Sequence, residues 1–209
     1  MQHQITLRDI EQIKRLAKRA KTSHADLSHA QRLNLIAQEH YRARSYRELR
    51  QWVARSLESH YELKDSGVIY CKLCRFTFVP GIAQDTITHE KRHLKFEDAL
   101  FSLGVLPAAH ATREQRKLEA HAQIHSAPTA VEELAGVEGL VNAWYDRSLE
   151  SAIGNGDWKK HPSLAEYAAM IFPTVESWLQ QSRALYLSKY GCYRGVIPEG
   201  QTTWVQPVG

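Results

Sequence analysis

Four residues near the middle of the chain have the types and the spacing needed to bind a metal ion. Cys71 and Cys74 are separated by two residues, 14 residues separate Cys74 from His89, and three separate His89 from His93. The two histidines, four positions apart, share one face of an expected helix. Thiolate and imidazole groups are the usual zinc ligands, and four of them fill a tetrahedral site. The spacing therefore predicts one structural zinc ion bound by all four side chains.

The same two histidines also delimit the motif H-E-x-x-H, in which a glutamate acts as general base on a metal-bound water in metalloproteases. Here Glu90 would be the base, and Glu119 is available as a third ligand. That chemistry needs an open coordination position for the water. Because thiolates from Cys71 and Cys74 would fill the coordination sphere, the metallohydrolase is a remote alternative, and Glu90 is expected to be a solvated helix residue.

The segment around these ligands resembles a C2H2 zinc finger. Apolar Ile69 and Phe78 flank the cysteines at positions that form the small core of such fingers. With Asp85, the order C-x2-C…D-x3-H-x3-H is most similar to the finger of cohesin acetyltransferases, whose acetyltransferase domain has no counterpart here. The resemblance implies a ββα unit completed by zinc, in agreement with the β-rich residues 67–81 and a helix over 85–104. Asp85 is expected to cap this helix and Gly104 to end it. Its loop is two residues longer than in the common DNA-reading type, which implies a structural or protein-docking finger rather than readout of base triplets.

The N-terminal region is basic. Residues 1–60 contain 12 Lys and Arg against 6 Asp and Glu, whereas residues 127–209 contain 6 against 9. Apolar periodicity predicts helices over 7–21, 28–40 and 45–61, and the last two are close enough for a helix-turn-helix or a helical hairpin. A basic surface of this kind indicates an anionic partner, DNA or RNA. The candidate contact residues lie on the third helix, just before it, and on the finger helix: Arg44, Arg47, Arg50, Gln51, Arg55, Lys91, Arg92 and Lys95.

Part of this basic region also resembles a short bacterial helical module with no assigned biochemical role. The resemblance rests on the pattern SHAQRLNLIAQEH…RSYRELRQW. It suggests a bacterial or mobile-element origin and implies no enzymatic activity. Within the pattern, Ser28 with Gln31 and Ser45 with Glu48 match the capping box of a helix start.

The C-terminal half is predicted to be helical and rich in aromatic residues. Thr112 and Gln115 are expected to cap a helix over 113–125, another helix follows Pro128, and Pro173 is expected to break the last helical segment. At helical spacing the aromatic side chains are expected to form mostly core, with the remainder a docking surface for a protein partner. These aromatic residues are Trp144, Tyr145, Trp158, Tyr167, Trp178, Tyr186 and Tyr190.

Composition indicates a protein of the cytoplasm. Three cysteines are too few for a disulfide framework, and Cys192 is expected to be an inert thiol. The chain has no apolar run of about 18 residues and no signal-peptide pattern at its start, so no membrane association is expected. His121 and His125 are four apart but lack further ligands nearby, so they are expected to lie on a polar helix face.

The sequence therefore predicts a mainly α fold, in which helical bundle regions flank one embedded ββα C2H2 zinc finger. The expected regions are a basic helical region (1–62), the finger (63–104), an aromatic-rich helical region (105–197) and a tail with Trp204 (198–209). The expected function is a non-catalytic zinc-finger nucleic-acid-binding or regulatory protein. The alternative is a protein-interaction module, such as an adaptor or antitoxin-like inhibitor, with a purely structural zinc.

Overall fold

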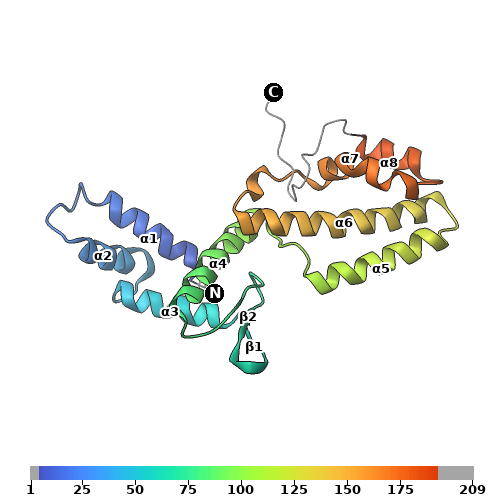
Figure 1. Cartoon of the computed structure of the whole chain (residues 1–209). Helices are drawn as coiled ribbons and strands as arrows, with labels where there is room; N and C mark the ends of the chain where they lie inside the picture. The colour runs from blue at the N-terminus through green and yellow to red at the C-terminus, as the bar shows by residue number, and fades with distance from the viewer. Residues whose placement is uncertain (1–4, 193–209) are drawn as a thin grey trace. The chain divides into compact units, whose positions relative to one another are not determined.

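The chain is mainly helical. The computed structural model describes residues 5–192, and over this range it contains helices and one small sheet, which lies between the third and fourth helices in the chain (Figure 1). The chain divides into two compact units, Met1–Gly104 and Val105–Gly209. Each unit has its own cluster of buried hydrophobic side chains. The prediction of a mainly α fold is therefore confirmed, while the predicted tail lies outside the described residues. No helix within residues 5–192 combines the length and the apolar character needed to cross a bilayer.

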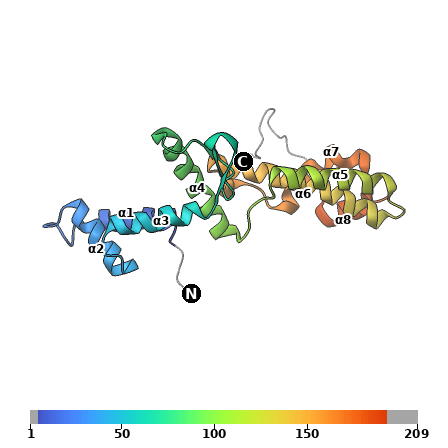
Figure 2. The ribbon, with the colours of Figure 1, turned by 90° about the horizontal axis from the view of Figure 1, so that it is seen from below.

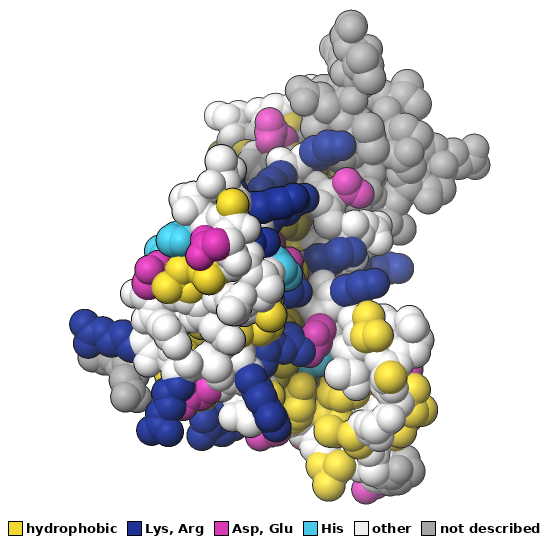
Figure 3. Space-filling view, turned by 90° about the vertical axis from the view of Figure 1, so that its left-hand side faces the viewer, with side chains coloured by type: hydrophobic (Ala, Val, Ile, Leu, Met, Phe, Trp, Pro, Cys, Tyr) yellow, Lys and Arg dark blue, Asp and Glu magenta, His cyan; other side chains and the backbone are white. Residues whose placement is uncertain are grey.

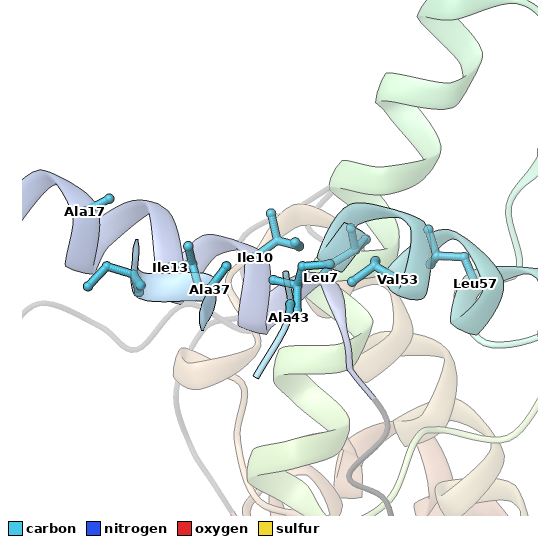
Figure 4. Close-up of a cluster of buried hydrophobic side chains, with 10 residues drawn as sticks. Leu7, Ile10, Ile13, Ala17, Ala37, Ala43, Val53 and Leu57 are labelled. Atoms are coloured by element: carbon cyan, nitrogen blue, oxygen red, sulfur yellow. The ribbon is translucent and has the colours of Figure 1, made fainter. Parts of the chain in front are cut away.

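Three amphipathic helices form the core of the first unit: α1 (Leu7–Arg19), α2 (His29–Tyr41) and α3 (Tyr46–Glu58). Apolar residues recur every three or four positions along each helix, so that each buries one stripe against the others. Figure 4 shows the resulting cluster, with Ile10 and Ile13 from α1 beside Ala37 from α2 and Val53 from α3. All four side chains are buried.

The turn between α2 and α3 is fixed by hydrogen bonds at both helix ends. Arg42 adopts the left-handed conformation (φ 56°) that ends α2, and the Ala43 amide donates back to the Ala37 carbonyl at 3.3 Å. Ser45 caps α3 by accepting from the Glu48 amide. The capping box predicted at Ser28 is confirmed, whereas the reciprocal half predicted at Ser45 is wrong, because the Glu48 carboxylate accepts from the Arg44 amide instead.

A three-stranded antiparallel sheet follows, in the order β1 (Tyr61–Leu63), β2 (Ile69–Cys71) and β3 (Thr77–Phe78). A 3-10 turn over Asp65–Gly67 joins the first two strands. The sequence indicated strand structure only from residue 67 onward, so β1 was missed. Its register places Tyr61 beside Cys71, and this pairing brings the end of α3 to the sheet.

The long helix α4 (Ala83–Leu103) completes the first unit and ends at Gly104 in the left-handed conformation, as the sequence predicts. The expectation that Asp85 caps this helix is wrong. The helix begins after Ile82, and the Asp85 carboxylate accepts from the Val79 amide at 3.1 Å, which ties the helix to the end of β3.

The second unit consists of helices. They are α5 (His110–Ser126), α6 (Ala130–Asn155), α7 (Leu164–Val175) and α8 (Arg183–Tyr190), with 3-10 turns at Trp158–Lys160 and Glu176–Trp178. Helices α5 and α6 lie side by side (Figures 1 and 2). Their close approach depends on Gly136, where an added Cβ would lie 2.8 Å from Ile124 Cγ1.

Two predicted boundaries in this unit are wrong. Helix α5 begins before Thr112, because the Arg113 amide donates to the Ala109 carbonyl and its guanidinium donates to the Ala108 carbonyl at 2.6 Å. Pro173 lies inside the last turns of α7, and the break comes only after Val175. A proline removes the one backbone hydrogen bond that its own nitrogen would donate, and here the helix continues for two further residues before it ends.

The aromatic residues of the second unit lie mostly in or against its core, as predicted. Tyr186 is fully buried, and its hydroxyl donates to the Ala168 carbonyl at 2.8 Å. Trp144, Tyr167 and Trp178 are partly buried against the same cluster. Their main role is therefore in the core of the second unit, and only a minor part of each side chain remains exposed to a partner.

Candidate metal centre

The structure brings the four candidate ligands together. Cys71 ends β2, Cys74 lies in the turn before β3, and His89 and His93 are on α4. All four side chains are buried, and their ligand atoms lie within 4.8 Å of one another. Within residues 5–192 they are the only such group of Cys, His, Asp and Glu residues. This group can hold a metal ion.

Backbone hydrogen bonds shape the turn that presents the cysteines. The Arg75 amide donates to the Cys71 carbonyl at 2.7 Å, and the Cys71 amide donates to the Phe76 carbonyl at 2.9 Å. Arg75 takes the left-handed conformation (φ 58°) that so tight a turn requires. From α4, the Arg92 guanidinium donates to the Cys74 carbonyl at 2.9 Å and so joins the turn to the helix that carries the histidines.

Aromatic rings enclose His89. Phe78 stacks on its ring at 4.4 Å between centroids, and Tyr61 meets it edge-on at 5.5 Å. The core position expected of Phe78 is confirmed, since only 6% of the residue is exposed. Tyr61 lies on β1, the strand that was not predicted, and its ring covers a side of His89 that a two-stranded unit would leave open.

The donor set fits a tetrahedral metal such as zinc. Ideal zinc–sulfur and zinc–nitrogen bonds place neighbouring donors about 3.3–3.8 Å apart. Cys71 Sγ lies 3.3 Å from His93 Nδ1, within that range. Nε2 of His89 is buried without a hydrogen-bond partner. An orphaned nitrogen in a dry site costs free energy unless something binds it, and a metal ion would bind it.

The ligand side chains shift one another's pKa values. The pKa of Cys71 is lowered, chiefly by a hydrogen bond from the Cys74 thiol and then by both histidines. The pKa of Cys74 is raised, because its thiol donates that hydrogen bond and is buried. Burial works to lower the pKa of His93, but the neighbouring Cys71 thiol and Glu97 carboxylate raise it to about 9. A divalent cation would stabilise both thiolates at once.

Glu90, the glutamate of H-E-x-x-H, pairs with an arginine of α3. Its carboxylate lies 3.2 Å from the Arg50 guanidinium of α3. The expectation of a merely solvated residue is therefore wrong, because Glu90 forms an ion pair that joins α3 to α4. Both side chains are partly exposed, so the pair contributes about 1 kcal/mol or less.

The residues predicted to contact nucleic acid differ in exposure and in the contacts that they already make. Arg50 is engaged by Glu90, and Arg92 is engaged by Cys74 and by the Phe96 ring, 4.9 Å from its guanidinium carbon. Others are exposed: Arg44, Arg47, Gln51, Arg55 and Lys91. Lys95 is half-buried. Lys and Arg side chains recur over the face that Figure 3 shows.

The exposed group includes one regular row on α3. Arg47, Gln51 and Arg55 are four positions apart and lie opposite the buried stripe of Leu49 and Val53. Within residues 5–192, Arg47 and Arg55 form no ion pair. We call these three residues the α3 row.

The other histidine pair only partly matches the polar helix face expected of it. His125 is exposed, but the half-buried His121 ring lies edge-on to Trp178, with ring centroids 5.5 Å apart. Among the described residues, neither belongs to a group that could hold a metal.

Two residues beside the metal centre were not predicted. Glu97 Oε1 lies 3.3 Å from His93 Nε2, and the His60 ring lies 5.4 Å from the His93 ring. The spacing of four between His93 and Glu97 was a usable signal, since such residues face each other on a helix. His60 had no such signal, because its position depends on how α3 and α4 pack.

No protein family, curated protein or solved structure matched this chain.

Proposed function

We propose that this chain is a non-catalytic nucleic-acid-binding protein whose first unit is stabilised by one zinc ion. The Cys71, Cys74, His89 and His93 group acts as a C2H2 finger, with β2, β3 and α4 as its ββα unit. The α3 row contacts the phosphates of the nucleic acid. The observation that carries the proposal is that row: arginines exposed, evenly spaced and without acidic partners, on the same compact unit as the metal centre.

The donor set supports a structural zinc rather than a hydrolytic one. Four buried protein ligands would complete a tetrahedron around a zinc ion and leave no position for a water molecule. A hydrolase would also need Glu90 as a free base beside that water. Its carboxylate instead pairs with Arg50. Both observations favour a closed site.

Charge and geometry support nucleic acid as the partner. The first unit carries 18 Lys and Arg against 12 Asp and Glu, whereas the second carries 9 against 11. The eight positions between Arg47 and Arg55 span about 12 Å of helix, which is about the width of the major groove of B-DNA. The two arginines can therefore contact phosphates on both sides of one groove.

The test is a salt titration of binding to labelled duplex and single-stranded nucleic acid. With three to five phosphate contacts, affinity should fall about 40- to 500-fold between 50 and 200 mM salt. Replacing Arg47 and Arg55 by glutamate should abolish binding and leave the helix content unchanged. The matched control reverses two exposed lysines of the second unit, Lys159 and Lys160, and should bind nearly as wild type does.

A protein partner is the second candidate, favoured by apolar side chains exposed on the second unit. Leu118 is 67% exposed and Val131 is 68% exposed, on α5 and α6. Such side chains mark a protein interface where they form a contiguous patch. If wild type binds neither duplex nor single strand at low salt, nucleic-acid binding is refuted and this candidate takes its place.

A further inference from the structure

We propose that Glu97 couples the metal centre to helix α1, so that zinc binding secures the N-terminal helix of the first unit. Glu97 lies on α4, one helical turn beyond the ligand His93. It belongs to neither the ligand set nor the α3 row. The inference rests on the proposed zinc centre and is independent of nucleic-acid binding.

One oxygen of Glu97 faces the ligand. Nδ1 of His93 is turned toward Cys71 Sγ at 3.3 Å, so Nδ1 is the nitrogen available to the metal. The opposite nitrogen, Nε2, lies 3.3 Å from Glu97 Oε1. Nε2 is buried and has no hydrogen-bond partner, and the Glu97 carboxylate is the acidic group beside it. A carboxylate in this position fixes the orientation of a metal-binding imidazole and strengthens it as a ligand.

The same carboxylate caps α1. The Leu7 amide donates to Glu97 Oε1 at 3.4 Å, and the Arg8 amide donates to Glu97 Oε2 at 3.1 Å. These amides begin the helix and have no partner within it. A negative charge here also complements the positive end of the helix dipole. One side chain therefore joins a metal ligand to the start of a helix about 90 positions earlier in the sequence.

The neighbouring residue provides a matched control. Asp98 also binds α1, through an ion pair with Arg8 at 2.5 Å. The structure gives it no contact with His93. Glu97→Gln and Asp98→Asn each remove one negative charge from adjacent positions of α4 while keeping the size of the side chain. Only the first change removes the carboxylate beside the ligand.

The first measurement is zinc affinity of the full chain, by competition with a chelator. Glu97→Gln should weaken zinc binding about 10- to 100-fold, whereas Asp98→Asn should bind zinc as wild type does. Nitrogen-15 NMR of the zinc-loaded wild type should show Nδ1 of His93 bound to the metal and Nε2 protonated. Equal zinc affinities for the two variants, or Nε2 bound to the metal, would overturn the inference.

The second measurement uses wild type alone and does not depend on how a variant folds. Removing zinc should accelerate hydrogen exchange of the Leu7 and Arg8 amides, while the amides of α6 in the second unit serve as an internal reference. If zinc binds but exchange in α1 is the same with and without it, the coupling is refuted and the metal centre stands. If wild type has no affinity for zinc, both the metal centre and the coupling are refuted.

Discussion

Glu133 of α6 is expected to be the most important single carboxylate for the stability of the second unit. Only 3% of the residue is exposed, yet its carboxylate accepts four hydrogen bonds. The donors are the amides of Gln180 (3.2 Å), Gln181 (2.8 Å) and Ser182 (2.7 Å) and the Ser182 hydroxyl (2.6 Å). This segment leads into α8, so Glu133 holds the last helix onto the core.

The cost of Glu133→Ala follows from the donors it leaves behind. The Ser182 amide and hydroxyl are buried and would lose their acceptor, whereas the Gln180 and Gln181 amides are partly buried and can bind water. Each buried donor left unsatisfied costs about 1–3 kcal/mol. We therefore expect a loss of about 2–6 kcal/mol, which lowers the melting temperature of a unit of this size by about 10–30 °C.

The assay is thermal unfolding by circular dichroism at neutral pH, with Glu132→Ala as control. Glu132 is exposed, and its carboxylate accepts from the Thr129 hydroxyl at the helix start. The control should cost about 1 kcal/mol or less, as other cap changes do. Equal losses in the two variants would show that the buried hydrogen bonds do not carry the stability assigned to them.

The pH dependence gives an independent check. Burial by itself raises the pKa of Glu133, but the hydrogen bonds from Ser182, Gln181 and Gln180 outweigh it and keep the pKa below its ordinary value. Because this pKa is lower in the folded state, the Glu133 carboxylate contributes fully to the free energy of unfolding at any pH above its unfolded-state pKa of about 4.3. It is lost as the pH falls through the folded-state pKa. The difference between wild type and Glu133→Ala should therefore shrink below about pH 4, as the carboxylate protonates.

Three further predictions concern other parts of the chain. Gly136→Ala should destabilise the second unit by about 1–3 kcal/mol, measured by chemical unfolding. The new Cβ would lie 2.8 Å from Ile124 Cγ1 and 3.1 Å from the Ala120 carbonyl oxygen. A stabilised variant would contradict the close packing of α5 and α6. X-ray absorption of the zinc-loaded chain should show two sulfur and two nitrogen neighbours around the zinc ion, and an oxygen neighbour would instead indicate an open site. The variant Cys74→Ser should lose the metal and the protease resistance of the first unit. Glu90→Gln should retain its full zinc content and lower the free energy of unfolding by about 1 kcal/mol or less, since it removes only a partly exposed ion pair. Loss of zinc would show that Glu90 takes part in the metal centre.

The helices and the metal ligands could be predicted because their signals are local. Leu7, Ile10, Ile13 and Ala17 repeat with the period of a helix, and all four are buried. The ligand spacing depends only on a short turn and one helix face. These signals need no knowledge of how distant segments meet.

The features that were missed depend on contacts between distant segments. Strand β1 forms only because Tyr61–Leu63 pairs with Ile69–Cys71, and three residues carry little strand signal alone. Glu133 resembles any other glutamate of a helix until the segment at Ser182 folds over it. The cap expected at Thr112 failed for a similar reason, because the contacts of Arg113 extend the helix past it.

The contact between Glu97 and the start of α1 also sets an order of events during synthesis. Helix α1 leaves the ribosome before α4, and the carboxylate that caps it is encoded about 90 residues later. At about 5–20 residues per second, roughly 5–20 seconds pass between the two. During that interval the first turn of α1 lacks its partner, and its apolar stripe has only α2 and α3 to cover it. Until α4 has been made, the start of α1 therefore lacks this contact and is open to proteases and chaperones.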